Sequence, residues 1–360
     1  MNLHHSTSSY IVYVGTYAEF DAPGLHAYYL DVHEGVVQPI DSLTGVENPS
    51  FLAVHPHEDV LYAVSERETG AEIVAVALLP SNRVQVLNRQ ACTGSAPCHL
   101  SLNGAGTHLV AANYAGGSVS LFPVLPSGHI GPETQCIAHQ GKGAHPVRQT
   151  EPHPHAAVFD PTDHRVLVPD LGTDRVAVYE IGGDQTRLSP LRELRMPDGA
   201  GPRHIAFAPG GSHMYVINEL NSTITVCAYD SRYGIIEPTQ TVTTVHGDAL
   251  ADNYPAGIAV SASGEFLYAS NRGQDSIAVF AVNRENGHLR YKEHVEAMGK
   301  TPRHFTITPD GRYLLAANQD SDNIATFRID PETGGLEPTP YTFHVPKPAC
   351  VIVRPASAPR

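Results

Sequence analysis

Five side chains that could bind an anion and move a proton interrupt an otherwise repeating sequence: His155, Arg203, Glu219, Arg272 and Arg303. Glutamate and histidine are common proton donors and acceptors in enzymes. Arginine stays protonated at neutral pH, so its expected role is to bind anionic groups or a developing oxyanion. The set therefore predicts acid–base chemistry on a small anionic molecule. The alternative interpretation is a group of salt bridges between repeat units.

The repeat that these residues interrupt begins at a proline. A short phrase such as NPSFLAVHP, GPRHIAFAP or TPRHFTITP recurs at separations of 48, 57, 48, 53, 47 and 46 residues. The anchor prolines are Pro49, Pro97, Pro154, Pro202, Pro255, Pro302 and Pro348. A second apolar run starts twelve residues after each of the first six anchors, and a third is centred near anchor plus 22. These runs of four to eight residues, rich in Val, Ile, Tyr and Phe, indicate strands.

Three strands and a weaker fourth in about 50 residues are typical of a β-propeller blade. The seventh anchor is followed only by its own strand and ASAPR, while the missing second and third runs occur as IVYVGTY from Ile11 and GLHAYYL from Gly24. We therefore expect an all-β, seven-bladed β-propeller whose last blade is closed by strands from both termini. Residues 1–360 would form a single domain, with the ordered repeats spanning about 10–355.

The offset of each residue from its anchor proline distinguishes structural residues from candidate site residues. A residue type that recurs at one offset is expected to serve the blade, whereas a residue that breaks the pattern is a candidate for the site. Asn at plus 16 and His at plus 2 recur, so structural roles are expected for them. The residues at plus 1 are Ser50, Cys98, His155, Arg203, Ala256, Arg303 and Ala349. The residues at plus 17 are Glu66, Tyr114, Leu171, Glu219, Arg272 and Gln319. An antiparallel return would bring both sets to the same end of the blades, so these side chains should converge.

The longest separation marks an insertion, HQGKGAHPVRQTEPHPHA, at residues 139–156. It contains Arg148, Gln149, His153 and His155, a basic and histidine-rich composition in an acidic chain. Long loops on a rigid scaffold often carry binding residues, although a solvated loop is the alternative. His153 and His155 would share one face of a strand, but no carboxylate set completes a metal site, so no metal is expected.

Composition excludes several partners. The net charge of -14 argues against nucleic-acid and anionic-membrane binding, and no apolar stretch approaches the ~20 residues of a membrane helix. The five cysteines are widely spaced without a C-x-x-C, and no signal peptide is evident. A cytoplasmic protein with reduced thiols, present as a monomer or weak homo-oligomer, is therefore expected.

The segments RQTEPHPHAAVFDP, GPRHIAFAPGGSHMYVINELNSTI and LYASNRGQDSIAVF resemble the lactonase-type seven-bladed propeller family, and the similarity runs through all seven units. That resemblance implies chemistry without cofactor or metal on a phosphorylated or carboxylated lactone. It also implies an active-site set that falls by motif on His155, Arg203, Glu219 and Arg272. One departure is the small pair Ala256 and Gly257, where larger or acidic residues are common in the family.

The resulting hypothesis is hydrolysis of an anionic sugar lactone, 6-phosphogluconolactone to 6-phosphogluconate. Glu219 would activate water and His155 would donate the proton, with the reverse assignment open. Arg203 and Arg272 would stabilise the oxyanion. The expected substrate-binding residues are Arg148, Gln149, His153, Arg303 and Glu66. Three alternatives remain: a carboxymuconate cycloisomerase using the same pocket, a non-enzymatic binding platform, and a calcium-dependent gluconolactonase-like propeller.

Overall fold

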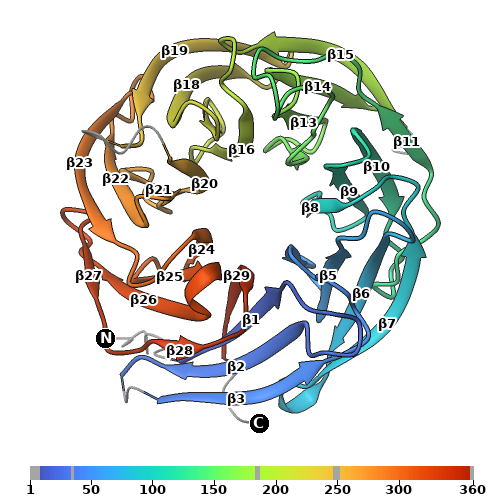
Figure 1. Ribbon diagram of the computed structural model, residues 1–360, viewed down its shortest axis with the longest axis vertical. Coiled ribbons are helices and arrows are strands. Elements are labelled where there is room, and N and C mark those ends of the chain that lie inside the picture. Colours follow the sequence, from blue (N-terminus) through green and yellow to red (C-terminus); the bar gives the residue numbers. More distant parts are fainter. Residues whose placement is uncertain (1–8, 34–35, 183–186, 246–251, 357–360) are drawn as a thin grey trace, which may run out of the picture.

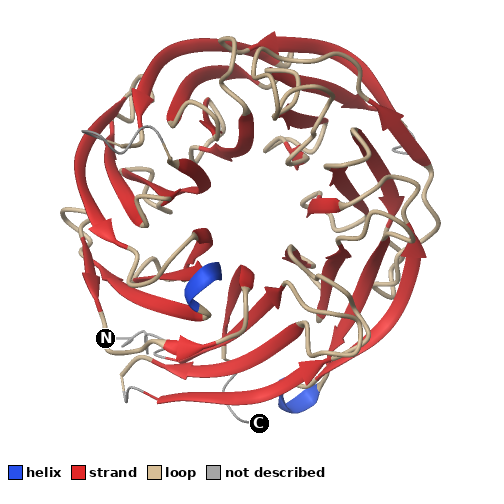
Figure 2. Ribbon diagram, in the orientation of Figure 1, coloured by secondary structure: helices blue, strands red, loops and turns tan. Residues whose placement is uncertain are grey.

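Seven antiparallel sheets stand side by side around a common axis (Figure 1). This computed structural model describes residues 9–33, 36–182, 187–245 and 252–356. Within those ranges the chain forms no α-helix, only the short 3-10 helices η1 (Pro80–Asn82) and η3 (Gln319–Ser321) (Figure 2). The predicted all-β, seven-bladed propeller is confirmed.

Each blade has four main strands, which lie side by side in order from the centre of the ring outwards. The innermost strands are β4 (Leu52–Val54), β8 (Pro97–Leu102), β12 (Val158–Phe159), β16 (Pro202–Phe207), β20 (Tyr254–Val260), β24 (Pro302–Ile307) and β29 (Pro348–Pro355). The second strands are β5 (Val60–Ser65), β9 (His108–Asn113), β13 (Arg165–Asp170), β17 (His213–Asn218), β21 (Phe266–Arg272), β25 (Tyr313–Asn318) and β1 (Ser9–Thr16).

The third strands are β6 (Glu72–Leu78), β10 (Ser118–Pro123), β14 (Arg175–Ile181), β18 (Thr223–Asp230), β22 (Ser276–Val282), β26 (Asn323–Ile329) and β2 (Leu25–Asp31). The outermost strands are β7 (Val84–Ala91), β11 (Gln135–Ala138), β15 (Leu188–Arg195), β19 (Ile235–Thr243), β23 (Leu289–Glu296), β27 (Leu336–Pro338) and β3 (Val36–Leu43). A two-residue strand, β28 (Phe343–His344), also pairs with β26.

The two ends of the chain meet in one blade, as the sequence predicts. Strand β29 pairs antiparallel with β1, with Tyr13 opposite Ile352, and β1 continues into β2 and β3. Figure 1 shows the red C-terminal strand beside the blue N-terminal one. Without β29, strand β1 would have no partner on its inner side, and the closure supplies that partner from within the chain.

The core lies between blades rather than within them. Seven clusters of buried apolar side chains each combine residues of two neighbouring sheets, as where Ile11 and Tyr13 of the closing blade pack against Leu61 and Val74 of the next. The β-branched and aromatic residues of the second and third strands fill these layers on both faces of each sheet. Every blade is thus held by two neighbours, which fixes the loops at the centre of the ring.

A repeated hydrogen bond ties some blades together at the far end from the candidate site. The Tyr62 hydroxyl donates to the Gly128 carbonyl of the next blade at 2.8 Å. Tyr268 donates to Gly334 in the same way at 2.9 Å. Both glycines have positive φ, and a Cβ atom at Gly334 would lie 2.4 Å from the Phe266 ring. Only glycine therefore fits the turn that receives the tyrosine.

Candidate active site

In blades two, four, six and seven the innermost strand begins with a β-bulge, and the bulged residue is the one at anchor plus 1. In blade four Pro202 pairs with Asn218 and His204 with Ile217, so Arg203 is left without a partner in the ladder. The same shift leaves Arg303 unpaired in blade six. A bulge re-aims the side chain of its extra residue. The strand pairing therefore turns these arginines away from the blade layers and towards the centre.

The antiparallel return brings the side chains at anchor plus 17 to this end of the ring, as the spacing predicts. Glu219 follows β17 directly, and its backbone N–H donates to the Gly201 carbonyl at 2.7 Å, immediately before the anchor Pro202. Arg272 is the last residue of β21. Side chains from the start of one strand and the end of the next can consequently meet across one blade and across its neighbours.

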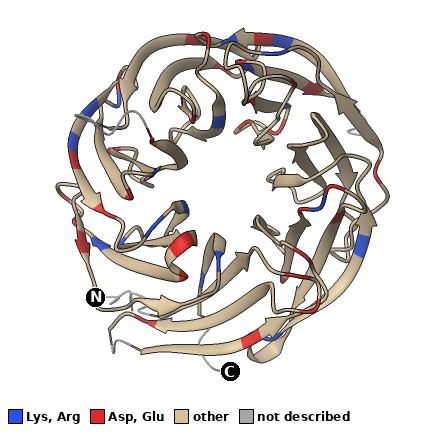
Figure 3. Cartoon of the chain, in the orientation of Figure 1, with Lys and Arg blue, Asp and Glu red and all other residues tan. Residues whose placement is uncertain are grey.

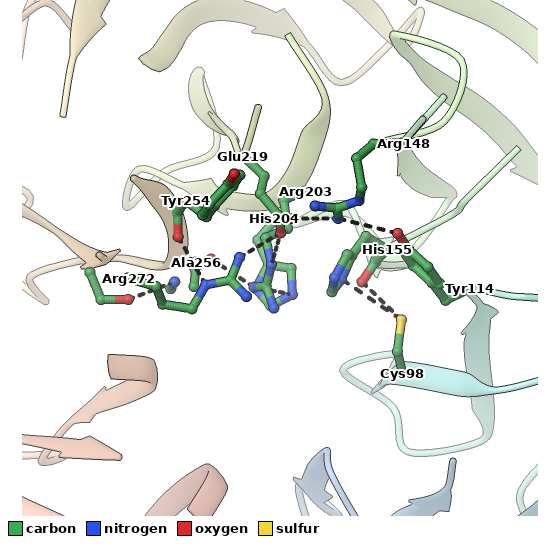
Figure 4. Close-up of polar contacts among 12 residues, drawn as sticks. Cys98, Tyr114, Arg148, His155, Arg203, His204, Glu219, Tyr254, Ala256 and Arg272 are labelled. Atoms are coloured by element: carbon green, nitrogen blue, oxygen red, sulfur yellow. Dashed lines mark hydrogen bonds and ion pairs between the residues drawn. The ribbon is translucent and has the colours of Figure 1, made fainter. Parts of the chain in front are cut away.

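Glu219 is the centre of a buried charge cluster (Figure 4). Its Oε2 accepts hydrogen bonds from Arg203 Nε at 3.0 Å and from Arg272 Nη2 at 2.7 Å. Its Oε1 accepts one from Arg148 Nη2 at 2.7 Å. The Glu219 side chain is 3% exposed, so one carboxylate shielded from water joins three guanidinium groups. The cluster carries a net positive charge, which suits an anionic ligand.

The arginines of this cluster have further partners that fix their planes. Arg203 Nη1 donates to the Ala256 carbonyl at 2.8 Å and to His204 Nε2 at 3.2 Å. Arg272 Nε donates to the Tyr254 carbonyl at 2.9 Å. The small residue at position 256 thus leaves its carbonyl accessible to Arg203. Such second contacts hold the donors in place before a ligand arrives.

Charge and burial set the protonation of the central groups. Burial alone would raise the pKa of Glu219, but the charges of Arg272 and Arg203 outweigh it and hold that pKa well below its usual range. Burial and the charge of Arg203 hold the pKa of His155 well below 6.5. Burial and the neighbouring Arg272 lower the pKa of Arg203 to about 9, so it stays cationic at neutral pH. Glu219 is therefore a weak base, and His155 is neutral.

The insertion at 139–156 is fastened at both ends to one buried aspartate. Asp170 Oδ2 accepts a hydrogen bond from His139 Nδ1 at 2.7 Å, and Oδ1 accepts one from the His153 backbone N–H at 2.8 Å. Nε2 of the same His139 ring lies 2.8 Å from the Tyr179 hydroxyl. Asp170 is fully buried. This clamp places the loop that carries Arg148 and His155.

Gln149 fastens the middle of the same loop. Its amide nitrogen donates to the Leu171 carbonyl at 2.8 Å and to Asp174 Oδ1 at 2.7 Å, and its oxygen accepts from the His145 backbone N–H. Gln149 is 1% exposed. Its amide groups are thus engaged by the protein, unlike the substrate-binding role expected from the sequence, and we assign it to holding the loop.

Tyrosine and histidine rings form the wall beside the loop. The His153 ring stacks on Tyr114 at 4.4 Å between centroids, and its Nδ1 lies 2.9 Å from the Tyr114 carbonyl. The His155 ring meets the same Tyr114 edge-on at 5.3 Å. Arg148 also donates to the Tyr114 hydroxyl at 3.3 Å. His153 and Arg148 therefore reach the site, with Tyr114 between them.

The opposite side of the ring carries a second group built from blades six, seven and one. The Arg303 guanidinium lies 5.2 Å from the centroid of the Tyr17 ring. The Tyr17 hydroxyl donates to Glu66 Oε2 at 3.1 Å, and Ser50 Oγ donates to the same oxygen. Within the described ranges Arg303 has no ion pair and no hydrogen bond from its side chain. It is the arginine here whose guanidinium is open to a ligand.

A layer of neutral histidines closes the ring beneath these groups. The histidines at anchor plus 2, His99, His204 and His304, surround the Phe51 ring at centroid distances of 4.2, 6.0 and 5.5 Å. Burial, together with the nearby His304 and Arg203, lowers the pKa of His99 to about 3, and burial with Arg203 lowers that of His304 to about 4. Only about 10 Å³ of free space remains between this layer and Arg203 and Arg303. A ligand must therefore bind above the histidines.

The structure places His155, Arg203, Glu219, Arg272 and Arg148 together in one half of the site and Arg303 with Glu66 in the other. Tyr17 was not anticipated from the sequence, although it is the seventh member of the plus 17 set once the N-terminal run IVYVGTY is counted with the last blade. Tyr114 was in that set without a role. Figure 3, which colours Lys and Arg positions blue along the chain, shows such positions near the inner edge of the ring as well as on its outer strands.

Two negative findings apply to the described ranges. They contain no cluster of three or more His, Cys, Asp or Glu side chains able to hold a metal ion. They also contain no helix long and apolar enough to cross a membrane. A cleft of about 500 Å³ on the outer edge, between β23 and β27, is lined by charged side chains such as Lys292 and Arg328 and lies away from the site.

Comparison with known proteins gives a consistent result. The family profile described as "Lactonase, 7-bladed beta-propeller" matches residues 11–353. A 6-phosphogluconolactonase of Bacillus subtilis is 34% identical over 345 residues, covering 96% of this chain and 98% of its own. A 6-phosphogluconolactonase of Formosa agariphila is 32% identical over 309 residues, covering 82% and 86%. The structure of a periplasmic gluconolactonase of Pseudomonas aeruginosa is 30% identical with a TM-score of 0.90, covering 96% and 99%.

Proposed function

Because the chain belongs to the seven-bladed β-propeller lactonase family, we propose that it hydrolyses 6-phosphogluconolactone to 6-phosphogluconate by acid–base catalysis without a metal ion. The observation that carries the proposal is the arginine arrangement. Three guanidinium groups share one buried carboxylate, and Arg303 stands opposite them without an anionic partner in the described ranges. A non-enzymatic platform is not expected to gather such groups at the centre of its ring.

The electrostatics favour His155 as the base and Glu219 as the anchor of the arginines, the reverse of the assignment first drawn from the sequence. A neutral imidazole can take a proton from the attacking water. The Glu219 carboxylate, already bound by three arginines, has little basicity left but stabilises the imidazolium that forms. Arg203 and Arg272 would face the tetrahedral oxyanion. A second group must supply the proton to the departing ring oxygen.

Arg303 is the proposed phosphate grip. A charge-assisted hydrogen bond is worth about 1.5–3 kcal/mol, or roughly 10- to 150-fold in binding. Arg303→Gln should therefore raise KM for the phosphorylated lactone by about that factor and leave KM for unphosphorylated gluconolactone unchanged. Arg328→Gln, at an exposed arginine of the third strand β26, is the matched control. An equal loss on both substrates would remove the phosphate assignment.

The substrate assignment itself is tested with a panel of sugar lactones with and without a 6-phosphate, followed by product identification. Two of the relatives above are named as 6-phosphogluconolactonases and one as a gluconolactonase, so the panel decides between phosphorylated and unphosphorylated lactones for this chain. Preference for unphosphorylated lactones by the wild-type protein would refute the phosphorylated substrate. Formation of a cyclised product from a carboxymuconate would instead support the cycloisomerase.

The remaining proposals concern assembly and compartment. We propose a monomer or weak homo-oligomer, because this chain alone supplies the strands of all seven sheets, the closing blade included. We propose the cytoplasm, since the five cysteines are free thiols and four of them are buried. Size-exclusion chromatography with light scattering, and fractionation of the source cells, test these two statements.

A further inference from the structure

The site contains a second carboxyl group, Glu66, whose surroundings differ from those of Glu219. Both oxygens of Glu219 accept guanidinium donors. Glu66 receives only hydroxyl donors, from Ser50 and Tyr17, and both bind the same oxygen, Oε2. Within the described part of the chain its Oε1 has no hydrogen-bond partner, and no Lys, Arg or His lies within ion-pair distance of either oxygen.

This pattern leaves one place for a proton. A protonated carboxyl group donates from one oxygen and accepts at the other. Because the two hydroxyls donate to Oε2, the proton of Glu66 belongs on Oε1. Glu66 also lines a cleft of about 430 Å³ together with Tyr17, Asn48 and Ala96. Glu66 thus forms part of a wall that a small molecule can reach.

Glu66 is also continuous with the proposed catalytic groups. Its partner Ser50 lines the same small space as Cys98, which also follows its anchor proline directly, and as Arg203 and Arg303. Cys98 Sγ lies 3.7 Å from His155 Nδ1. A lactone held by these arginines would lie with His155 on one side and Glu66 on the other.

We propose that Glu66 is the general acid of this site and that its Oε1 protonates the ring oxygen that departs from the lactone carbonyl. The inference rests on the proposed lactone hydrolysis. His155 takes a proton as water adds to the carbonyl carbon. The bond between that carbon and the ring oxygen then breaks, and the oxygen takes the Glu66 proton to become a hydroxyl. His155 returns its proton to Glu66 through solvent, and the product carboxylic acid ionises.

The charges around Glu66 agree with this role. Burial raises the pKa of Glu66, and the lowering effects of Arg303 and of the Ser50 and Tyr17 hydrogen bonds offset it only in part. The titratable and charged groups that face Glu66 or share its cleft are Arg303, Arg203, Tyr17, Cys98, Glu47, Arg67 and Glu68. The two carboxyl groups of the site are thus shifted in opposite directions, which is how neighbouring acids take different roles.

The experiment compares Glu66→Gln with wild type on lactones whose leaving groups differ. Gln keeps the size of Glu and an acceptor for Ser50 and Tyr17, but it cannot donate a carboxyl proton. On a sugar lactone, which departs as an alkoxide, kcat should fall about 10²- to 10⁴-fold with little change in KM. On an aryl lactone, which departs as a phenolate of pKa near 10, the fall should be less than about 10-fold. Glu68→Gln, exposed in the same cleft, is the control.

A pH profile supplies a second readout. The acid form of Glu66 is lost as the pH rises, so wild-type kcat on the sugar lactone should fall on the alkaline side, and Glu66→Gln should lack that limb. Tyr17→Phe keeps the ring over Arg303 and removes one hydrogen bond to the carboxylate. That loss raises the pKa of Glu66, so the limb should move to higher pH. Spontaneous hydrolysis is subtracted at each pH.

The outcomes separate the two proposals. Wild-type protein that turns over no lactone overturns the proposed function and this inference with it. Active wild-type protein overturns the inference alone if Glu66→Gln keeps its alkaline limb, or if kcat falls equally on sugar and aryl lactones. A rise in KM without a fall in kcat would make Glu66 a hydroxyl-binding residue instead. If the aryl lactone is not turned over, the pH profiles decide.

Discussion

Replacing Glu219 by Gln removes the negative charge that three buried arginines share. Arg203 keeps a side chain only 3% exposed, so it cannot recover the loss by hydration, whereas Arg148 at 35% can in part. Breaking a buried ion pair from one side costs about 3–5 kcal/mol. At an unfolding entropy of about 2.1 cal/mol/K per residue, 360 residues give about 0.76 kcal/mol/K, so the midpoint should fall by about 4–7 °C.

The pH dependence of that loss identifies its cause. The pKa of Glu219 is depressed in the folded protein, while in the unfolded chain it is about 4.3. Its contribution is therefore complete above the unfolded value. Below about pH 4.3 the unfolded chain binds a proton that the folded protein does not, so wild type loses up to about 1.4 kcal/mol per pH unit. The amide of the Glu219→Gln variant cannot titrate, and the gap between the two proteins should narrow by that amount.

The assay is calorimetric unfolding of both proteins between pH 7 and pH 3. Glu337→Gln, which alters an exposed carboxylate paired with Arg328, should leave the midpoint unchanged. A gap under about 1 kcal/mol at pH 7, well short of the cost of breaking a buried pair, would show that the arginines do not depend on Glu219. A gap that stays constant from pH 5 to pH 3 would show that the carboxylate is not the titrating group.

Three further outcomes are expected. His155→Gln should lower kcat about 10²- to 10⁴-fold in kinetic assays. Because the pKa of His155 is lowered, wild-type activity should not fall as the pH drops from 7 to 6 and should fall only at lower pH, where acid protonates the base; a loss of activity from pH 7 to pH 6 would contradict the assignment. Asp170→Ala should release both ends of the 139–156 loop and lower kcat/KM at least about 10-fold. A folded variant with full kcat/KM would show that Asp170 is not needed to place the loop. Excess EDTA should leave activity unchanged, whereas loss that calcium restores would favour the calcium-dependent alternative.

The sequence predicts the architecture well because the same pattern, an anchor proline followed by apolar runs at constant offsets, recurs in every blade. Strands β8, β16, β24 and β29 begin at the anchor prolines Pro97, Pro202, Pro302 and Pro348. The closing blade followed from the runs missing at one end and present at the other. In blades one and three the innermost strands are shorter, Leu52–Val54 and Val158–Phe159, although the same phrase is present.

The sequence predicts the end of the ring at which the site residues lie, but not which of their side chains bind each other. Constant offsets put Arg203, Glu219 and Arg272 at one end of the ring. No offset predicts that these two arginines and Arg148 all bind the Glu219 carboxylate. That depends on how blades four and five and the 139–156 loop face each other across the centre. The roles of Glu219 and His155 depend on those charges, so the sequence left their assignment open. Tyr17 was overlooked because it lies at the opposite end of the chain from Pro348, the anchor of its own blade.

The closing strand has a consequence for synthesis on the ribosome. Strand β1 and Tyr17 are synthesised before the other strands of the described ring, but β1 has no inner partner until β29 (Pro348–Pro355) has also been synthesised. The other blades are synthesised before β29 can pair with β1. The contact between Tyr10 and Asp310, which lies near this junction, joins residues 300 positions apart. Pairing over such separations is slow. The Tyr17, Glu66 and Arg303 group is therefore assembled last, and a chain that stops before Pro348 would be released with this group incomplete.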